Sequence, residues 1–265
     1  LGKLPRTSER IAVELEGALN TLNITGDLIF VGHSFGAFHM RKFNDLFPER
    51  IKGMVLVDSA NPNSTIGCDE PKKERSTSLF IHLGSLVAET GIVRLVELFG
   101  FTPLLGPIGK LPKEVQKEYV QHFNRPGFFL SVIEEKRLWF RSCASFPRFP
   151  RMGVNLLDFP LTVIIPSQGL FRKDLSAGQE QALLSSTGKY VQVDDHQATH
   201  TNIIFNQSFA KIVSRETLSI IDLLRLENHK AKAEENKIMD EDTEKAKTET
   251  LSAESESESE CEKSE

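Results

Sequence analysis

The motif Gly32-His33-Ser34-Phe35-Gly36 constrains this chain more than any other feature, because of what stands on either side of it. The apolar run at residues 28–31 comes before it and is typical of a strand buried on both faces of a parallel sheet. Residues 37–47 follow with helical spacing and end at Pro48. A G-x-S-x-G sequence between a strand and a helix forms a sharp turn that lifts the serine hydroxyl above the sheet. We therefore predict that Ser34 is a nucleophile rather than a serine in an ordinary glycine-rich loop.

The residues around Ser34 each have an expected part in this turn. At Gly32 and Gly36 we expect that a side chain would collide with the neighbouring strand or helix. The helix that follows points its amino terminus at the serine, where free amides and the helix dipole favour negative charge. The amide of Phe35 is then placed to donate one hydrogen bond to an oxyanion.

The order of elements around the motif predicts an α/β fold with a mostly parallel central sheet flanked by helices. A helical segment begins at Ser8 and keeps apolar residues at helical spacing up to Leu22. Further buried strands are predicted at 51–57, 161–165 and 189–193, with helices near 177–185 and 208–226. We expect residues 1–62 and 156–227 to form the core of this fold.

Two other regions have different compositions. Residues 63–155 contain short helical segments, such as 79–98 and 113–123, punctuated by prolines, and we interpret them as an inserted helical cap or lid. Charged residues interrupt the apolar stretch of this cap, so we expect no transmembrane segment. Residues 228–265 lack Phe, Tyr, Trp and Val, which predicts a disordered acidic tail that could recruit protein partners.

Charge and cysteine content narrow the function classes. The net charge of −5 owes much to the tail, and no stripe of Lys and Arg with interleaved aromatics is present, so we expect no nucleic-acid partner. Cys68, Cys143 and Cys261 lie far apart with no CxxC pair, which suggests neither a disulfide framework nor a metal site. This favours a reducing compartment such as the cytoplasm.

The chain starts at Leu1 without a signal segment, and we expect that it begins inside a longer protein whose targeting segment could precede it.

A nucleophilic serine needs a histidine base within hydrogen-bond reach. His196 and His200 follow the last predicted strand, where the chain order serine–acid–histidine places the base. We favour His200, which stands just before an apolar run and the closing helix, and keep His196 as the alternative. His33 lies inside the turn, and we expect its ring to point away from the serine hydroxyl.

The acid that orients the histidine has two candidates at strand ends. Asp58 ends the strand that follows the nucleophile, in the sequence VLVDSA. Asp174 follows the next core strand and would need a longer loop to reach the histidine. Directly after that later strand the chain has Ser167-Gln168-Gly169, without a carboxylate. We favour Asp58 and keep Asp174 as the alternative.

At these residues the chain resembles the α/β-hydrolase fold superfamily, in its single-domain esterase and lipase-like branch. The resemblance rests on PRTSERIAVEL, IFVGHSFGAF, FPERIKGMVLVDSANP, PLTVIIPSQG and HTNIIFNQ, and covers about residues 5–225. It implies a triad of Ser34, His200 and an acid, acyl-enzyme chemistry, and no metal or other cofactor. Two departures stand out: Thr199 replaces a usual glycine before the histidine, and the early strands with the HG-containing oxyanion loop are missing here.

The sequence therefore predicts a serine hydrolase that cleaves a carboxylic ester of a small molecule through Ser34, His200 and Asp58. An alternative is a catalytically impaired binding or scaffold protein of the same fold, and the departures just named motivate it. The chain could also be an N-terminally truncated fragment of a complete enzyme. Lyase or cofactor-free peroxidase chemistry on the same fold is a further alternative.

Overall fold

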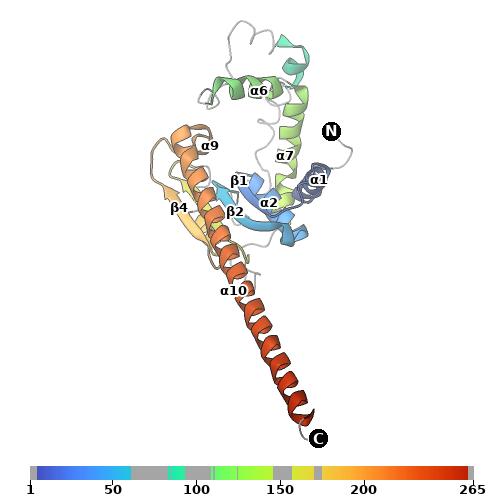
Figure 1. Ribbon diagram of the computed structural model, residues 1–265. Coiled ribbons are helices and arrows are strands. Elements are labelled where there is room, and N and C mark those ends of the chain that lie inside the picture. The colour runs from blue at the N-terminus through green and yellow to red at the C-terminus, as the bar shows by residue number, and fades with distance from the viewer. Residues whose placement is uncertain are drawn as a thin grey trace. The chain divides into compact units, whose positions relative to one another are not determined.

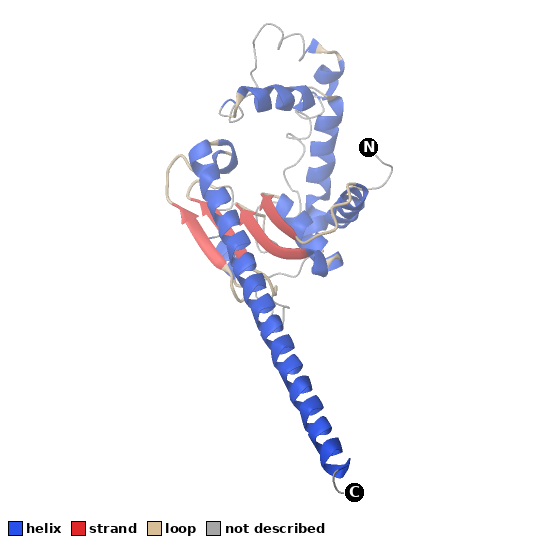
Figure 2. Ribbon diagram, in the orientation of Figure 1, coloured by secondary structure: helices blue, strands red, loops and turns tan. Residues whose placement is uncertain are grey.

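A four-stranded parallel sheet forms the centre of the protein (Figure 1; Figure 2). The computed structural model describes residues 5–60, 83, 85–92, 109, 111–123, 125–145, 157–169 and 175–261. Within these residues the strands follow the order β1-β2-β3-β4, with bounds Leu28–His33, Ile51–Val57, Leu161–Pro166 and Lys189–Val193. All three pairings are parallel. The predicted fold class, a parallel α/β sheet flanked by helices, is confirmed.

Three helices pack on one face of this sheet: α1 (Ser8–Thr21), α2 (Gly36–Leu46) and α8 (Leu175–Ala182). Their buried side chains share one apolar cluster with alternate residues of β2 and β3. The cluster includes Ala12, Ala37, Phe43, Ala182, Met54, Leu56, Leu161, Val163 and Ile165. Because side chains alternate along a strand, the residues between them point to the other face. Apolar side chains of β2 and β3 therefore point to both faces of the sheet, and both faces have to be covered by helices.

The first part of the long helix α10 (Gln207–Cys261), up to Ile220, covers the opposite face. A Cβ at Gly53 would lie 2.5 Å from Cγ2 of Ile220, so the helix packs directly on β2 at that point. Between the helix layers, β3 is buried along its whole length and β2 is buried except at Lys52. The prediction that these two strands are buried is confirmed.

The strand β1 differs from that prediction, because it is only partly buried. Gly32 is buried, but Val31 is 41% exposed and the remaining residues are intermediate. The reason is its place in the sheet: among the described strands, β1 pairs with β2 alone and forms an edge. The apolar run at residues 28–31 could not distinguish an edge strand from a central one.

Two described helices lie in the region interpreted as a cap: α6 (Lys113–Phe123) and α7 (Pro126–Ala144). The helix predicted at 113–123 is present with the same bounds, whereas most of the segment 79–98 lies outside the described residues. From α7, Ser142 Oγ accepts a 3.4 Å hydrogen bond from the amide of Ser8 at the start of α1. This contact joins the cap region to the core.

Cys143, near the end of α7, is buried and disulfide-bonded. The cysteine spacing suggested no disulfide framework, so this disulfide was not predicted. Spacing along the chain indicates local motifs such as CxxC, but it gives no information on which distant segments fold against each other. The argument for a reducing compartment from cysteine spacing therefore loses its support.

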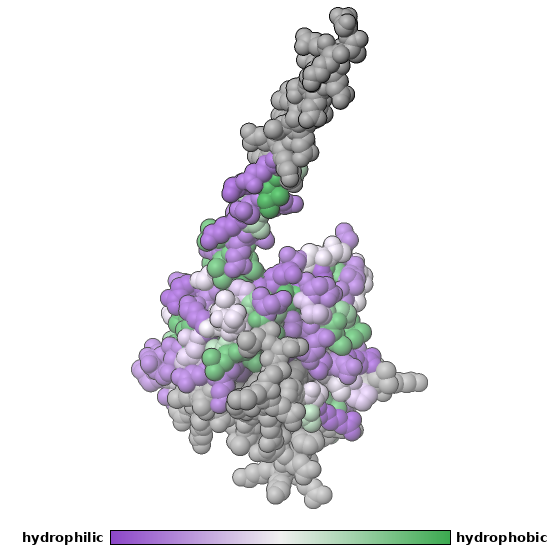
Figure 3. Space-filling view, turned by 90° about the horizontal axis from the view of Figure 1, so that it is seen from below, coloured by the Kyte–Doolittle hydropathy of each residue, from purple (hydrophilic) through white to green (hydrophobic). Residues whose placement is uncertain are grey.

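The C-terminal residues divide from the rest as a second compact unit, from Ile221 onward. The structure does not confirm the predicted disordered tail, since α10 continues to Cys261. The segment is rich in Ala, Glu and Lys, which have high helix propensity, and Lys237 and Glu241 form an i,i+4 ion pair at 3.8 Å. Its described side chains are exposed and mainly hydrophilic (Figure 3). None of the described helices is both long and apolar enough to span a membrane.

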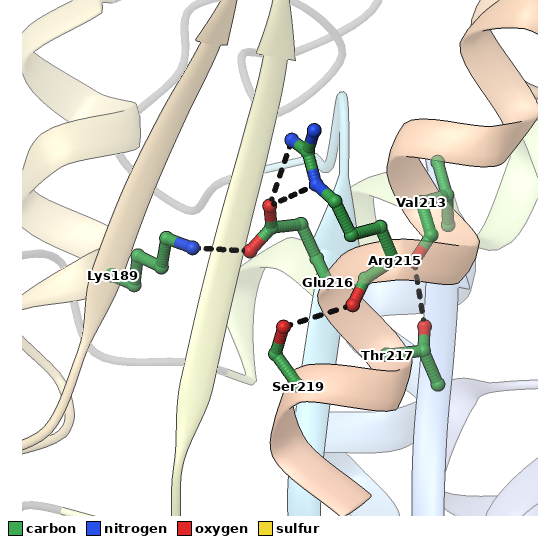
Figure 4. Close-up of polar contacts among 6 residues, drawn as sticks. All are labelled: Lys189, Val213, Arg215, Glu216, Thr217 and Ser219. Carbon is green, nitrogen blue, oxygen red and sulfur yellow. Dashed lines mark hydrogen bonds and ion pairs between the residues drawn. The ribbon is translucent and has the colours of Figure 1, made fainter. Parts of the chain in front are cut away.

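A buried carboxylate fixes the first part of α10 to the sheet (Figure 4). The Glu216 side chain is 3% exposed and accepts hydrogen bonds from Lys189 of β4 at 2.5 Å and from Arg215 at 3.1 Å. Burial alone would raise the pKa of Glu216. The hydrogen bonds from Lys189 and Arg215 outweigh it, so the pKa lies below the ordinary value. The carboxylate is thus held in its charged form between helix and strand.

Replacing Glu216 by Gln should lower the free energy of unfolding at pH 7 by about 1–2 kcal/mol, because two hydrogen bonds to a charged group are weakened. Since the folded-state pKa lies below the unfolded value of about 4.3, this stabilisation is present above that value and is lost as the pH falls through the folded-state pKa. Urea unfolding of both proteins between pH 3 and 8 measures the difference. Equal stability of the two proteins at pH 7 would contradict the assignment, and the exposed Glu227→Gln serves as control.

Candidate active site

Ser34 stands directly after β1, in the turn between that strand and α2. Its φ of 56° lies in the left-handed region, which residues other than glycine rarely adopt. Hydrogen bonds fix the turn to the segment at the end of β2. The Ser34 amide donates to the Val57 carbonyl at 3.1 Å, and the Ser34 carbonyl accepts from the Ala60 amide at 3.0 Å. The surrounding structure thus holds a strained residue in one conformation.

The two glycines of the turn differ in their surroundings. A Cβ at Gly32 would lie 2.5 Å from Sδ of Met40 and 3.3 Å from the amide nitrogen of Ala37, so glycine allows close packing of β1 against α2. The expected collision is absent at Gly36, where no described atom lies within 4 Å of the Cβ position. Gly36 begins α2, and the space beside it is open among the described residues.

Asp58 follows the last residue of β2, at the same carboxyl end of the parallel strands as Ser34. In the parallel pairing His33 lies opposite Val57, so the next residues of the two strands stand side by side. The Asp58 side chain is fully buried, and its φ of 37° is also positive. Of the three described non-glycine residues with positive φ, two are Ser34 and Asp58. Backbone strain concentrates at functional sites, and here it occurs at the two residues predicted from the sequence as nucleophile and favoured acid.

His200 lies in the loop between β4 and α9 (Asn202–Phe205) and reaches Asp58. Its Nδ1 is 2.6 Å from Oδ2 of Asp58, and its side chain is 24% exposed. A carboxylate accepts hydrogen bonds, so Nδ1 carries the hydrogen and Nε2 of the neutral ring can accept a proton. Among the described residues, Oγ of Ser34 makes no hydrogen bond, to His200 or to any other group.

Thr199 occupies the position where the resemblance led us to expect glycine. Its Oγ1 accepts a 3.2 Å hydrogen bond from the amide of Asn202, the first residue of α9. The backbone beside it is joined to the segment after β3, since the Gln168 amide donates to the Ala198 carbonyl at 2.9 Å. The threonine at position 199 therefore has a structural role: its hydrogen bond holds the backbone directly before His200 in place.

Gly169 is part of the site, although sequence reasoning gave it no role. A Cβ at this position would lie 2.6 Å from Oδ1 of Asp58 and 2.8 Å from Cγ and Oδ2. The segment after β3 therefore supplies the room that the Asp58 carboxylate occupies. The signal was present in the sequence, because Ser167-Gln168-Gly169 stands where a carboxylate was sought and not found.

The His33 ring, which we expected to point away from the Ser34 hydroxyl, contacts His200. The two rings lie 4.4 Å apart, centroid to centroid, and Nε2 of His33 is 2.7 Å from the His200 carbonyl oxygen. Burial, followed by the charge of His200, lowers the pKa of His33. His39, on α2, is bonded through Nδ1 to Ser8 Oγ at 3.0 Å, and burial lowers its pKa to about 4.

The structure thus brings Asp58 and His200 together beside the Ser34 turn. The alternative base, His196, is 87% exposed, and its Nδ1 lies 3.6 Å from Asp195. The alternative acid, Asp174, lies outside the described residues. Of the two histidines considered, only His200 has a buried carboxylate partner among the described residues.

Comparisons with known proteins agree with this architecture. No protein-family model and no curated protein matches the chain. Among solved structures, Cfl2 from Burkholderia cenocepacia is 18% identical with a TM-score of 0.53, covering 82% of this chain and 73% of its own. MGS-M2, an alpha/beta hydrolase enzyme from a deep-sea metagenome library of the Medee basin, is 15% identical with a TM-score of 0.51, covering 83% and 74%. This chain has the α/β-hydrolase fold.

A third solved structure adds to the likeness. CarC, a serine hydrolase involved in carbazole degradation, is 14% identical with a TM-score of 0.51, covering 84% of this chain and 74% of its own. The α/β-hydrolase fold supports many reactions, so the reaction of this chain has to be argued from the residues at the carboxyl ends of its strands.

Gly169→Ala tests whether the segment after β3 makes room for Asp58. The added methyl group should push the carboxylate away and lengthen the distance between Asp58 Oδ2 and His200 Nδ1. The free energy of unfolding should fall by about 1–3 kcal/mol, as expected for overpacking. A crystal structure and urea unfolding measure the two effects.

The matched control for this variant is Gly17→Ala. Gly17 lies on α1, where no described atom lies within 4 Å of the Cβ position, and alanine should stabilise the helix by about 0.5–1 kcal/mol. An unchanged distance between Asp58 and His200 in Gly169→Ala, with unchanged stability, would show that the close approach has no consequence.

Proposed function

We propose that this chain is a serine hydrolase that cleaves a carboxylic ester. The observation that carries the proposal is the 2.6 Å hydrogen bond between His200 Nδ1 and the buried carboxylate of Asp58, beside the strained Ser34. A carboxylate that holds one nitrogen of an imidazole keeps the ring in one tautomer and stabilises the imidazolium. The other nitrogen can then take the proton of a serine hydroxyl.

The proposed reaction proceeds through an acyl-enzyme. Oγ of Ser34 attacks the carbonyl carbon of the ester while its proton passes to Nε2 of His200. The tetrahedral intermediate collapses, the carbon–oxygen bond of the ester breaks, and His200 gives the proton to the leaving alcohol. A water molecule, deprotonated by His200, then attacks the acyl group and releases the carboxylic acid. The Asp58 carboxylate holds His200 in both half-reactions.

The Phe35 amide is the proposed oxyanion donor. It stands at the start of α2, and among the described residues it donates no hydrogen bond. A free amide at a helix N-terminus favours a developing negative charge. One such donor contributes about 3–4 kcal/mol of transition-state stabilisation in a serine hydrolase.

Aromatic residues beside the turn support an ester with an apolar acyl part. Trp139 of α7 stacks on Phe35, with ring centroids 4.4 Å apart and an interplanar angle of 14°. The pair packs against the buried Phe38 and Ala60. Among the residues that the structure describes, the buried Trp139 Nε1 has no hydrogen-bond partner. Since buried donors are normally satisfied, we assign this group to an oxygen atom of the substrate.

A second candidate is a non-catalytic binding protein with the same fold. The observation that favours it is that Ser34 Oγ is not hydrogen-bonded to His200 among the described residues. In many free enzymes this bond is long and tightens only with substrate, so the geometry is compatible with both candidates. Chemical trapping of the serine separates them.

A fluorophosphonate probe should form a single adduct on Ser34, detected by mass spectrometry of the purified chain. Ser34→Ala should abolish the adduct, and His200→Gln should slow its formation by about 10⁴-fold or more. Asp58→Asn should cost on the order of 10⁴ in kcat for p-nitrophenyl butyrate, because the wrong tautomer of His200 is held. The exposed His196→Gln should leave both rates unchanged. Absence of any adduct on the folded chain would favour the binding protein.

Two variants of Trp139 separate its packing from its hydrogen bond. Trp139→Ala removes both and should raise KM for p-nitrophenyl octanoate about tenfold, because apolar contact with the acyl chain is lost. Trp139→Phe keeps an aromatic ring against Phe35 and should change that KM less than threefold. Steady-state kinetics with the acetate and octanoate esters measure the effect. Equal KM values for all three proteins would remove Trp139 from the substrate site.

A further inference from the structure

The backbone of His200 is held by a side chain to which the proposed reaction gives no role. The Asp58 carboxylate fixes the ring of His200 at Nδ1, but the residue itself lies in a loop between β4 and α9. Its carbonyl oxygen lies 2.7 Å from Nε2 of His33. The two rings also contact each other, with centroids 4.4 Å apart and planes tilted by 34°. His33 therefore contacts both the main chain and the ring of His200.

We propose that His33 is a positioning residue that fixes the distance between the base His200 and the nucleophile Ser34. This inference rests on the proposed serine-hydrolase function. His33 is covalently joined to Ser34 as its neighbour in the chain. Its hydrogen bond to the His200 carbonyl links two segments 167 residues apart through one side chain. The base is thereby attached to the same turn that carries the nucleophile.

The chemistry of the contact defines the state of His33. A carbonyl oxygen only accepts hydrogen bonds, so Nε2 of His33 must carry a hydrogen. Burial, and next the charge of His200, lower the pKa of His33, which favours its neutral form with the hydrogen on Nε2. When His200 takes the serine proton, its positive charge is balanced by Asp58 and faces a neutral ring. His33 can thus hold the base throughout the cycle without competing for the proton.

The expected size of the effect follows from the sensitivity of proton transfer to distance. A misplacement of about 1 Å in a catalytic group can cost on the order of 100-fold in rate. Loss of the anchor should therefore lower kcat while leaving substrate contacts, and so KM, nearly unchanged. A residue that only fills space would instead lower the stability of the fold and the yield of active protein.

His33→Phe and His33→Gln form the test pair. Phenylalanine keeps a ring against His200 but removes the donor, and glutamine keeps an N–H donor of similar reach. With p-nitrophenyl butyrate, His33→Phe should lower kcat about 10- to 100-fold with KM within twofold of the unchanged chain, and His33→Gln should restore kcat to within about fivefold. The rate of fluorophosphonate labelling of Ser34 should change in parallel. The exposed His122→Gln on α6 is the control.

An activity-independent readout separates this inference from the proposed function. In ¹⁵N-histidine-labelled protein, the Nδ1 hydrogen of His200 bonded to Asp58 should give a downfield proton signal that persists in His33→Gln and broadens or disappears in folded His33→Phe. If the unchanged chain is not labelled at Ser34, the hydrolase proposal fails while this signal still tests the positioning. Wild-type kcat and an unchanged signal in His33→Phe would overturn the inference, as would a folded His33→Gln that is no better than His33→Phe.

Discussion

The candidate site depends on the parallel pairing of β1 with β2. Because His33 lies opposite Val57, the residues that follow the two strands, Ser34 and Asp58, lie next to each other at the carboxyl ends of the strands. A shift of one residue in this register would turn side chains to opposite faces and separate the two groups. The same pairing supplies the hydrogen bond from the Ser34 amide to the Val57 carbonyl. The Ser34 turn and Asp58 are therefore placed by one piece of backbone geometry.

The position of the proposed acid, Asp58, has a physical explanation in the neighbouring segment. The loop after β3 brings Gly169 against the Asp58 carboxylate, and its backbone also joins the histidine loop through the bond from Gln168 to Ala198. A carboxylate on that segment would compete for the space that Asp58 already fills. The lack of a side chain at Gly169 and the presence of Asp58 are thus two parts of one arrangement, which supports Asp58 over an acid from the later loop.

Local patterns predicted more of this molecule than long-range contacts did. Continuous apolar runs identified β2 and β3, and the flanking strand and helix identified the turn at Ser34. The favoured choice of His200 followed from chain order, and the structure pairs it with Asp58. The contact of His33 with His200, by contrast, joins residues far apart in sequence, and no periodicity records it. The partial burial of β1 and the disulfide of Cys143 were missed for the same reason, since both depend on which segments become neighbours.

The tightly buried core holds the strained backbone of Ser34 and Asp58 in place. Positive φ values at Ser34 and Asp58 each cost on the order of 1–3 kcal/mol and persist only where the surroundings over-determine them. Here β2 and β3 provide that constraint, because Val55, Leu56 and Val57 are fully buried directly before Asp58. Loosening this packing would relax the backbone of Asp58 and with it the hydrogen bond to His200. The stability of the sheet and the geometry of the site are therefore coupled through the last residues of β2.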